Sequence, residues 1–233
     1  PVVILTNAPR PSAIIPPQLD RLGLPRSAYD GVATSGDATR AAIARRLPDP
    51  AFRIGPAMDD PLFEGLAIDF RPLDEAAFII CTGLNDDERE EPEAYRDLLS
   101  RAAARRLPMI CANPDIIVNW GGRMVWCAGA LGELYEALGG EVIYGGKPHW
   151  PIYELALDQI EKARGAPTPR SRILAIGDGL MTDIKGADNH GFDAMLITGE
   201  GGVHEGGSDL ASVTAKLNEA GLGAVAIAEA LRW

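Results

Sequence analysis

The sequence has little cysteine and no long apolar run. Its three cysteines, Cys81, Cys111 and Cys127, are odd in number, and none belongs to a C-x-x-C pair. That spacing favours neither a disulfide framework nor a zinc site, and their apolar neighbours predict that all three pack in a core. No apolar run approaches the roughly 20 residues that a membrane-spanning helix needs. We therefore expect no membrane partner and a cytoplasmic location.

Basic residues are also scarce. The chain has 22 lysine and arginine residues against 33 aspartate and glutamate residues, which gives a formal net charge of −11 over 233 residues. Proteins that bind nucleic acid non-specifically carry a basic excess, because phosphate backbones attract lysine and arginine. The composition therefore argues against a nucleic-acid partner. Its 46% hydrophobic content is enough for one large or two modest domains.

The sequence lacks an initiator methionine as well. Pro1 leads directly into a β-branched run at residues 2–5, with no connecting segment before it. We expect the natural protein to contain residues upstream of Pro1.

Apolar runs of strand length alternate with segments of helical period along most of the chain. The runs fall at residues 2–5, 78–80, 109–111, 173–176, 194–197 and 224–227, and helices are predicted at 37–46, 93–106, 130–138, 150–164 and 209–220. This alternation is typical of βαβ units with a mostly parallel sheet. The sequence therefore predicts an α/β fold.

Proline and glycine divide this pattern into parts. Pro48-Asp49-Pro50 ends a helix, and the pairs Gly139-Gly140 and Gly145-Gly146 bracket a short strand. The segment between these breaks has strands and helices of its own. We predict a core domain built from residues 1–48 and 142–233, with residues 49–141 inserted into it. The acidic run at residues 86–91 of the insert is interpreted as a solvated surface loop.

Three polar clusters follow predicted strands or glycine-rich turns. Thr6 and Asn7 come after the first strand and can hydrogen-bond phosphate oxygens, although such pairs also form turns and helix caps. Lys147 lies in a Gly-Gly-Lys-Pro turn, where it could neutralise a phosphate or be solvated. Asp178 and Asp183 follow a later strand, at the sheet edge where open α/β folds bind ligands. Carboxylates suit Mg²⁺, which usually accompanies a phosphate, whereas the simpler interpretation of Asp178 is a helix cap.

In this order the three clusters resemble the second, third and fourth motifs of the haloacid dehalogenase (HAD) superfamily. The insert resembles the large α/β cap of class IIA, whose members include NagD and the 4-nitrophenyl phosphate phosphatases. Ala112-Asn113-Pro114-Asp115 is similar to the Asn-Pro-Asp turn of that class, and Gly129-Ala130-Leu131 is similar to the helix start that follows it. The resemblance spans nearly the whole chain and implies a Rossmann-like parallel-sheet core with an inserted α/β cap.

The resemblance also implies an activity. It indicates a Mg²⁺-dependent phosphatase that forms an aspartyl-phosphate and acts on a small phosphorylated metabolite, such as a sugar phosphate, a nucleotide monophosphate or a cofactor phosphate. In such an enzyme Thr6, Asn7 and Lys147 bind the phosphoryl group, and Asp178 ligates Mg²⁺. Asp183 then orients Lys147 or a metal-bound water.

The cap side of the site follows from the same resemblance. Asn113 and Asp115 are the residues expected to bind substrate there. The cap is expected to exclude water and to select the leaving group. Caps of this class often pair, so a homodimer through the cap is a further expectation.

One motif of the superfamily is missing from these residues. Its nucleophile ends an apolar strand with Asp-x-Asp-Gly, and the nearest match, Tyr29-Asp30-Gly31-Val32, has Ala28 in the nucleophile's place. No apolar run precedes it, so residues 29–32 are interpreted as a loop between helices. The resemblance therefore places the nucleophile upstream of residue 1.

Two other functions remain open from the sequence. The first is a non-catalytic protein on the same fold that binds a phosphorylated metabolite or serves a regulatory role. The second is an α/β nucleotide-binding protein of unrelated mechanism.

Overall fold

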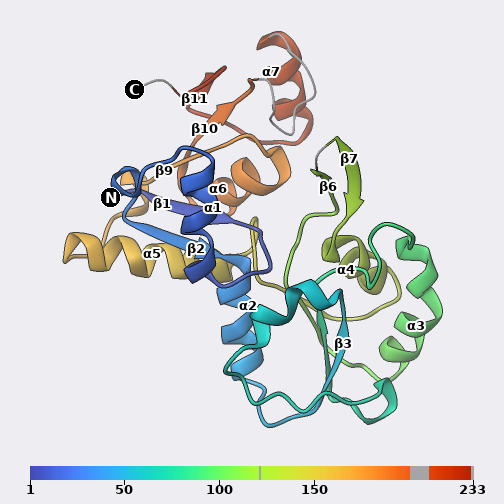
Figure 1. Cartoon of the computed structure of the whole chain (residues 1–233). Coiled ribbons are helices and arrows are strands. Elements are labelled where there is room, and N and C mark those ends of the chain that lie inside the picture. The colour runs from blue at the N-terminus through green and yellow to red at the C-terminus, as the bar shows by residue number, and fades with distance from the viewer. Residues whose placement is uncertain (121, 200–209, 232–233) are drawn as a thin grey trace. The chain divides into compact units, whose positions relative to one another are not determined.

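The computed structural model describes residues 1–120, 122–199 and 210–231 (Figure 1). Its contacts divide the chain into two compact units, Pro1–Ala163 and Arg164–Trp233. Each unit contains parallel strands and a hydrophobic core of its own. Within these described ranges, no helix combines the length and the apolar character that crossing a bilayer requires.

The first unit contains eight strands among its described residues, together with five α-helices. The strands are β1 (Val3–Thr6), β2 (Gly31–Thr34), β3 (Ala51–Ile54), β4 (Phe78–Cys81), β5 (Met109–Cys111), β6 (Ile117–Trp120), β7 (Arg123–Trp126) and β8 (Val142–Tyr144). The helices are α1 (Pro16–Arg21), α2 (Ser35–Ala44), α3 (Arg96–Ala104), α4 (Ala128–Ala137) and α5 (Trp150–Arg164). Short 3-10 helices lie at Ser12–Ile14, Arg26–Ala28, Ala57–Phe63, Leu73–Glu75 and Pro92–Tyr95.

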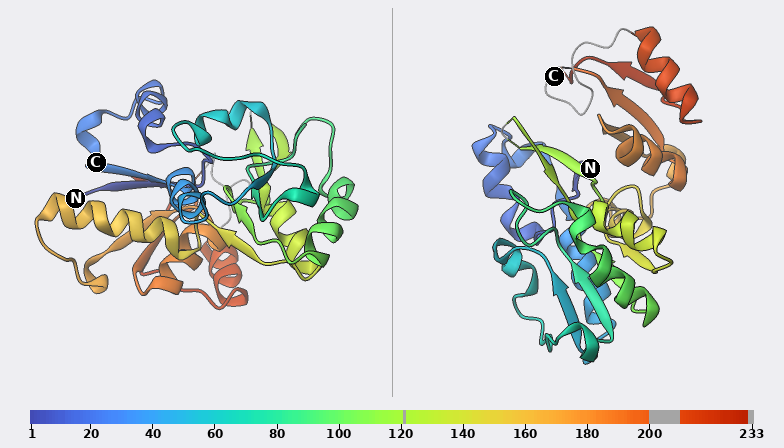
Figure 2. Two further views of the ribbon diagram at one scale, coloured as in Figure 1. Left: turned by 90° about the horizontal axis from the view of Figure 1, so that it is seen from below. Right: turned by 90° about the vertical axis from the view of Figure 1, so that its right-hand side faces the viewer.

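A four-stranded parallel sheet in the order β3-β4-β5-β8 forms the centre of the first unit. Successive side chains of a strand point to opposite faces, so Ile79 and Cys81 join one core while Phe78 and Ile80 join the other. Helices α3 and α4 pack on the first face, and α2 packs on the second through Ile43 (Figures 1 and 2). The strands are therefore buried on both faces, as parallel strands usually are.

Two smaller sheets complete the first unit. Strands β1 and β2 pair in parallel, with Thr6 opposite Thr34 at their carboxyl ends. Strands β6 and β7 form an antiparallel hairpin. The Thr34 hydroxyl accepts a hydrogen bond of 2.9 Å from the Asp37 amide and so caps the start of α2. The chain thus passes from the end of β2 directly into a helix that covers the larger sheet.

The second unit has a parallel sheet in the order β11-β10-β9. Its elements are β9 (Leu174–Gly177), a π-helical turn (Leu180–Ile184), α6 (Lys185–His190), β10 (Asp193–Ile197), α7 (Leu210–Glu219) and β11 (Ala226–Ala228), with a 3-10 helix at Arg170–Arg172. Helices α6 and α7 pack against β10 in one core. Strand β9 is an edge of this sheet, and its Leu174 and Ile176 side chains are 48% and 45% exposed.

The α/β fold predicted from the sequence is confirmed. Helix α5 has the predicted bounds, and the other predicted helices lie within three residues of theirs, although residue 209, where the last one was expected to begin, is outside the described residues. The strand expected between the two glycine pairs is β8. All three cysteines are free and buried, as predicted.

The interpretation of residues 29–32 as a loop between helices is wrong. Gly31 and Val32 begin β2, which pairs with β1 along its whole length. This strand is short and has only one strongly β-forming apolar side chain, so periodicity did not reveal it. Burial of the segment explains why it forms a strand, because Ala33 and Thr34 are both 0% exposed. Strands β3, β6 and β7 were not predicted either.

The bounds predicted for the core (1–48 and 142–233) and for the insert (49–141) stay a prediction. Two contacts link residues on opposite sides of the predicted boundaries near residues 48 and 142. Strand β8 pairs with β5, so the four-stranded sheet continues to Tyr144. Ile43 of α2 is packed in the core on one face of that sheet.

We expect Tyr135→Phe to lower the free energy of unfolding by about 1–3 kcal/mol. The Tyr135 side chain is 0% exposed, and its hydroxyl donates a 2.6 Å hydrogen bond to the Leu107 carbonyl, which the variant would leave buried without that donor. Tyr29→Phe is the matched control, because the buried Tyr29 hydroxyl has no hydrogen-bond partner among the described residues. Urea unfolding of both variants measures the difference. Equal losses in the two would contradict the assignment.

Candidate active site

Three of the predicted site residues come together at the carboxyl ends of parallel strands in the first unit. Asn7 follows β1, Asp115 lies in the turn after β5, and Lys147 follows β8. Asn7 is buried at 6% exposure, and the other two are half-buried. Strands β5 and β8 are neighbours in the four-stranded parallel sheet, so Asp115 and Lys147 follow carboxyl ends at one sheet edge. Asn7 comes from the separate sheet of β1 and β2 and reaches them through its side-chain hydrogen bonds.

The Asn7 side chain holds this cluster together. Its Nδ2 donates to Asp115 Oδ1 at 2.8 Å and to the carbonyl oxygen of Lys147 at 3.1 Å. Its Oδ1 accepts a hydrogen bond of 2.7 Å from the Lys147 amide. Both donors and one acceptor position of the amide are therefore used within the protein. In this arrangement Asn7 positions the backbone of Lys147, and its phosphate-binding role stays a prediction.

Gly146 makes the close approach possible. A Cβ atom there would lie 2.4 Å from Asn7 Oδ1 and 2.8 Å from Pro114 Cδ, both shorter than any normal contact. The Gly-Gly-Lys-Pro turn is thus packed against the loop after β1. Any larger residue would push Lys147 away from Asn7.

Two further predicted residues border the same cluster. The Thr6 hydroxyl accepts a hydrogen bond of 3.2 Å from the Ala8 amide, which leaves its own hydrogen able to donate. The Asn113 side chain accepts a hydrogen bond of 3.0 Å from the Asp115 amide. This Asx turn sets the direction of the Asp115 carboxylate toward Asn7.

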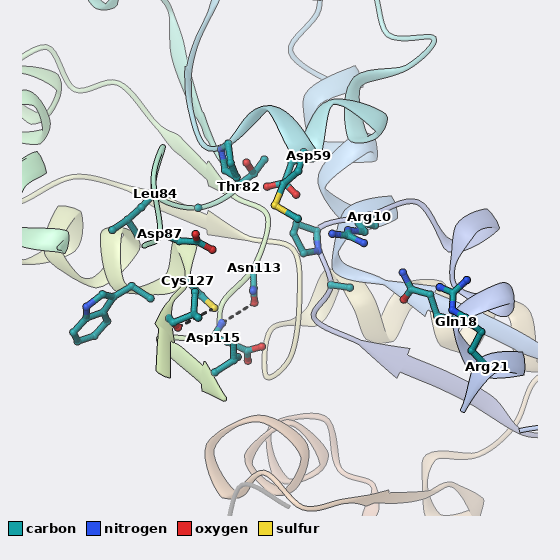
Figure 3. Close-up of a pocket in the computed structure, with 18 residues that line it drawn as sticks. Arg10, Gln18, Arg21, Asp59, Thr82, Leu84, Asp87, Asn113, Asp115 and Cys127 are labelled. Carbon is teal, nitrogen blue, oxygen red and sulfur yellow. Dashed lines mark hydrogen bonds between the residues drawn. The ribbon is translucent and has the colours of Figure 1, made fainter. Parts of the chain in front are cut away.

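A cavity of about 560 Å³ opens beside the cluster (Figure 3). It lies at the carboxyl ends of β3, β4 and β5 and includes Asn113 and Asp115 in its lining. Asp87 also lines it, so the acidic run at 86–91 is not only the solvated surface loop that the sequence suggested. The volume falls in the range of small-molecule sites.

Sequence reasoning missed several polar residues of this cavity. Arg10, Gln18 and Arg21 lie on one side of it, whereas Asp59 and Thr82 come from the loops after β3 and β4 (Figure 3). No motif or spacing marks them, because they come from helix α1 and from separate segments after β1, β3 and β4 that only the fold brings together.

Asp59 is the most deeply buried charged group in this lining. Its residue is 5% exposed, and burial raises the pKa of its carboxyl, while the Thr82 hydroxyl and then the Arg10 and Arg53 guanidiniums act in the opposite direction. Burial also raises the pKa of the neighbouring Cys81 thiol to about 12, so this cysteine stays protonated and unreactive at neutral pH.

The predicted metal ligand and its neighbour lie in the second unit. Asp183 Oδ2 accepts a hydrogen bond of 3.0 Å from the Gly179 amide, in the π-helical turn after β9. Gly177 has no side chain to obstruct this, since a Cβ atom would lie 2.3 Å from the Asp183 carboxyl carbon. Asp178 and Glu229 line a cavity of about 370 Å³ at the carboxyl ends of β9 and β11.

These groups fit the chemistry of Mg²⁺. The ion binds oxygen, commonly through only one or two carboxylates, with waters and phosphate oxygens completing its octahedron. Asp178, the predicted ligand, offers such a donor directly after β9, at the edge of the sheet where ligands bind. The described residues contain no group of three or more histidine, cysteine or acidic side chains placed to hold a metal. The structure thus places Asp178 and Asp183 in the second unit and joins Asn7, Asp115 and Lys147 in the first.

Comparison with known proteins shows what the chain is similar to. A family model for HAD-hydrolase-like proteins matches residues 144–220. A hydrolase of the haloacid dehalogenase-like family from Brucella suis 1330 is 45% identical, with a TM-score of 0.84 over 99% of this chain and 83% of that one. No protein among curated sequences matches.

More distant structures share the fold. A p-nitrophenyl phosphatase from Archaeoglobus fulgidus is 23% identical, with a TM-score of 0.71 over 97% of this chain and 82% of that one. A thermostable NPPase double mutant from Geobacillus stearothermophilus is 19% identical, with a TM-score of 0.70 over 100% of this chain and 86% of that one.

We expect Asn7→Asp to lower the free energy of unfolding at neutral pH by at least about 2 kcal/mol. The substitution replaces the Nδ2 donor by an oxygen that faces the Asp115 carboxylate and the Lys147 carbonyl. Two close carboxylates raise one pKa, so the folded variant binds more protons than the unfolded chain. The loss should therefore shrink as the pH falls from neutral to about 4.5, which urea unfolding at several pH values measures.

The matched control reverses the polarity of the pair. Asn7→Asp combined with Asp115→Asn restores one donor and one acceptor, and it should recover part of the lost stability. A pH-independent loss, or no recovery in the double variant, would show that the Asn7–Asp115 hydrogen bond does not determine the stability of this cluster.

Proposed function

This chain belongs to the haloacid dehalogenase-like hydrolases, and on that basis we propose that it is a Mg²⁺-dependent phosphatase acting on a small phosphorylated metabolite. The observation that carries the proposal is the position of Lys147. Two hydrogen bonds with Asn7 fix the Lys147 backbone just after β8. Asp115, which also binds Asn7, lines the cavity of substrate size. A lysine whose backbone is held in this way can present its ammonium to a phosphate, and phosphoryl transfer relies on such positioned charge.

The first unit would bind the phosphate. The Thr6 hydroxyl donates to a phosphoryl oxygen, and the Lys147 ammonium offsets the charge of the phosphate and of the attacking carboxylate. That carboxylate forms a bond to phosphorus while the bond to the leaving-group oxygen breaks, and water then hydrolyses the aspartyl-phosphate. Its aspartate is the residue expected upstream of residue 1. Asn7 and Asp115 keep the lysine in place during both steps.

The second unit would supply the metal side. Asp178 would hold Mg²⁺, and Asp183, oriented by the Gly179 amide, would align a bound water or the lysine. The ion supplies positive charge that stabilises the phosphoryl oxygens as their charge shifts toward the leaving group.

We expect Asp178→Asn to lower Mg²⁺-dependent release of phosphate from p-nitrophenyl phosphate by roughly a hundredfold or more, since an amide oxygen is a poor substitute for a carboxylate ligand. The assay uses the full-length protein with and without Mg²⁺. Asp193→Asn is the matched control, because Asp193 is an exposed aspartate at the opposite, amino end of β10 and should leave the rate unchanged.

The rival functions give different results in the same assay. A non-catalytic binding protein retains affinity for inorganic phosphate but releases none from any ester. A nucleotide-binding protein of unrelated mechanism shows the same ligand affinity after Asp178→Asn. Either result would overturn the proposed activity.

A further inference from the structure

The 560 Å³ cavity of the first unit carries charged groups that phosphate transfer itself does not need. Arg10 and Arg21, with the Gln18 amide, lie on one side, while Asp59 and Asp87 come from the loops after β3 and β4 (Figure 3). The cavity thus presents a basic wall and an acidic wall to one ligand. Apolar side chains of Met58, Leu84, Val118 and Val125 also line it.

Hydrogen bonds anchor the loop that carries Arg10, and the guanidinium groups of the basic wall are available to bind an anion. The loop that carries Arg10 is anchored to the start of α2, since the Gly36 amide donates to the Ala8 carbonyl at 3.2 Å and the Ser12 amide donates to the Asp37 carboxylate at 3.2 Å. Among the residues that the structure describes, neither Arg10 nor Arg21 has an ion-pair partner. Arg26, close by in sequence, pairs with Asp20 at 3.0 Å.

Asp59 lines the cavity, and the nearby Arg53 guanidinium interacts with neighbouring groups. The Arg53 guanidinium is 2.6 Å from Asp60 and also donates to the Pro56 carbonyl at 2.7 Å. Asp59 forms no direct ion pair with Arg10, although the two charges attract each other. A buried carboxylate without a contacting cation costs stability, and the raised pKa of this group reflects that cost. A positively charged ligand group would offset it.

The cavity borders the phosphate site of the proposed enzyme. Ala8, next to Asn7, and Asp115, its hydrogen-bond partner, both line it. A phosphate bound at Thr6 and Lys147 would therefore direct its leaving group into this cavity. The groups found there are those that select the leaving group.

Resting on the proposed phosphatase function, we propose that the leaving group is zwitterionic, with a carboxylate bound by Arg10 and Arg21 and an ammonium bound by Asp59 and Asp87. Phosphate esters of hydroxyl-bearing amino acids have this chemistry. Water and such an ester give the free hydroxy amino acid and inorganic phosphate. In the first step the aspartate–phosphorus bond forms, the bond from phosphorus to the serine-type oxygen breaks, and that oxygen takes a proton from solvent. In the second step water attacks phosphorus, its hydroxyl stays on the phosphate, its proton returns to solvent and the aspartate carboxylate is released. No reactant other than water is required.

The test is a panel of four phosphate esters of similar size assayed with the full-length protein and Mg²⁺. O-phosphoserine has both charged groups, phosphoglycerate only the acid, phosphoethanolamine only the amine, and glycerol phosphate neither. We expect kcat/KM for O-phosphoserine to exceed that for each of the other three by at least about tenfold. Calorimetric binding should give the same order of affinity.

Two variants assign the walls. Arg10→Gln should lower about tenfold the ratio of kcat/KM for esters with a carboxylate to kcat/KM for esters without one. Asp59→Asn should lower about tenfold the ratio of kcat/KM for esters with an amine to kcat/KM for esters without one. Arg26→Gln and Asp60→Asn are the matched controls, as both residues form surface ion pairs outside the cavity and should leave the preferences unchanged. Asp59→Asn should also keep or raise the melting temperature at neutral pH, because it removes a buried charge whose pKa is raised.

The outcomes separate the two proposals. Equal kcat/KM and equal affinity for all four esters, with phosphate still released, would overturn the zwitterion inference and leave the phosphatase intact. No release from any ester would overturn the phosphatase, and the order of binding affinities would then decide the cavity's preference. If a cavity variant fails to fold, Arg21→Gln and Asp87→Asn test the same walls from more exposed positions.

Discussion

One buried amide joins three loops of the first unit that carry predicted site residues. The Asn7 side chain joins the end of β1 to the turn after β5 and to the backbone after β8, through hydrogen bonds of 2.7–3.1 Å. Since the Asn7 amide is buried, each of these bonds is costly to leave unmade. The small size of Gly146 lets the loops approach closely enough to form them. The position of Lys147, and with it the geometry of the proposed phosphate site, depends on this contact.

The parallel sheet gives the site its shape. Each loop that lines the larger cavity leaves the carboxyl end of a strand or precedes the start of a helix, so chemistry-bearing residues gather without a dedicated scaffold. The two cores on opposite faces of the sheet make this edge rigid. Functional groups can then carry unfavourable features, such as the buried Asp59 carboxylate, because the packed strands behind them supply the stability.

From the sequence, candidate site residues could be proposed where a local pattern marks them. Thr6, Lys147 and Asp178 come after apolar runs or in glycine-rich turns, and such signals need no knowledge of the rest of the chain. Strand β2 escaped prediction because its burial, not its own pattern, makes it a strand. Arg10 and Asp59 escaped because a cavity is formed by loops that are distant in sequence. The spacing of residues along the sequence does not indicate which of these loops will face each other across the cavity.

A structure of the full-length protein with Mg²⁺ and orthovanadate, a mimic of the transferring phosphoryl group, tests the central claim most directly. We expect the vanadate oxygens to contact Thr6 and Lys147 while the ion is bound by Asp178. We also expect the Asn7 hydrogen bonds to Asp115 and Lys147 to remain intact. Vanadate bound away from Lys147, or a metal ion without Asp178 among its ligands, would contradict it.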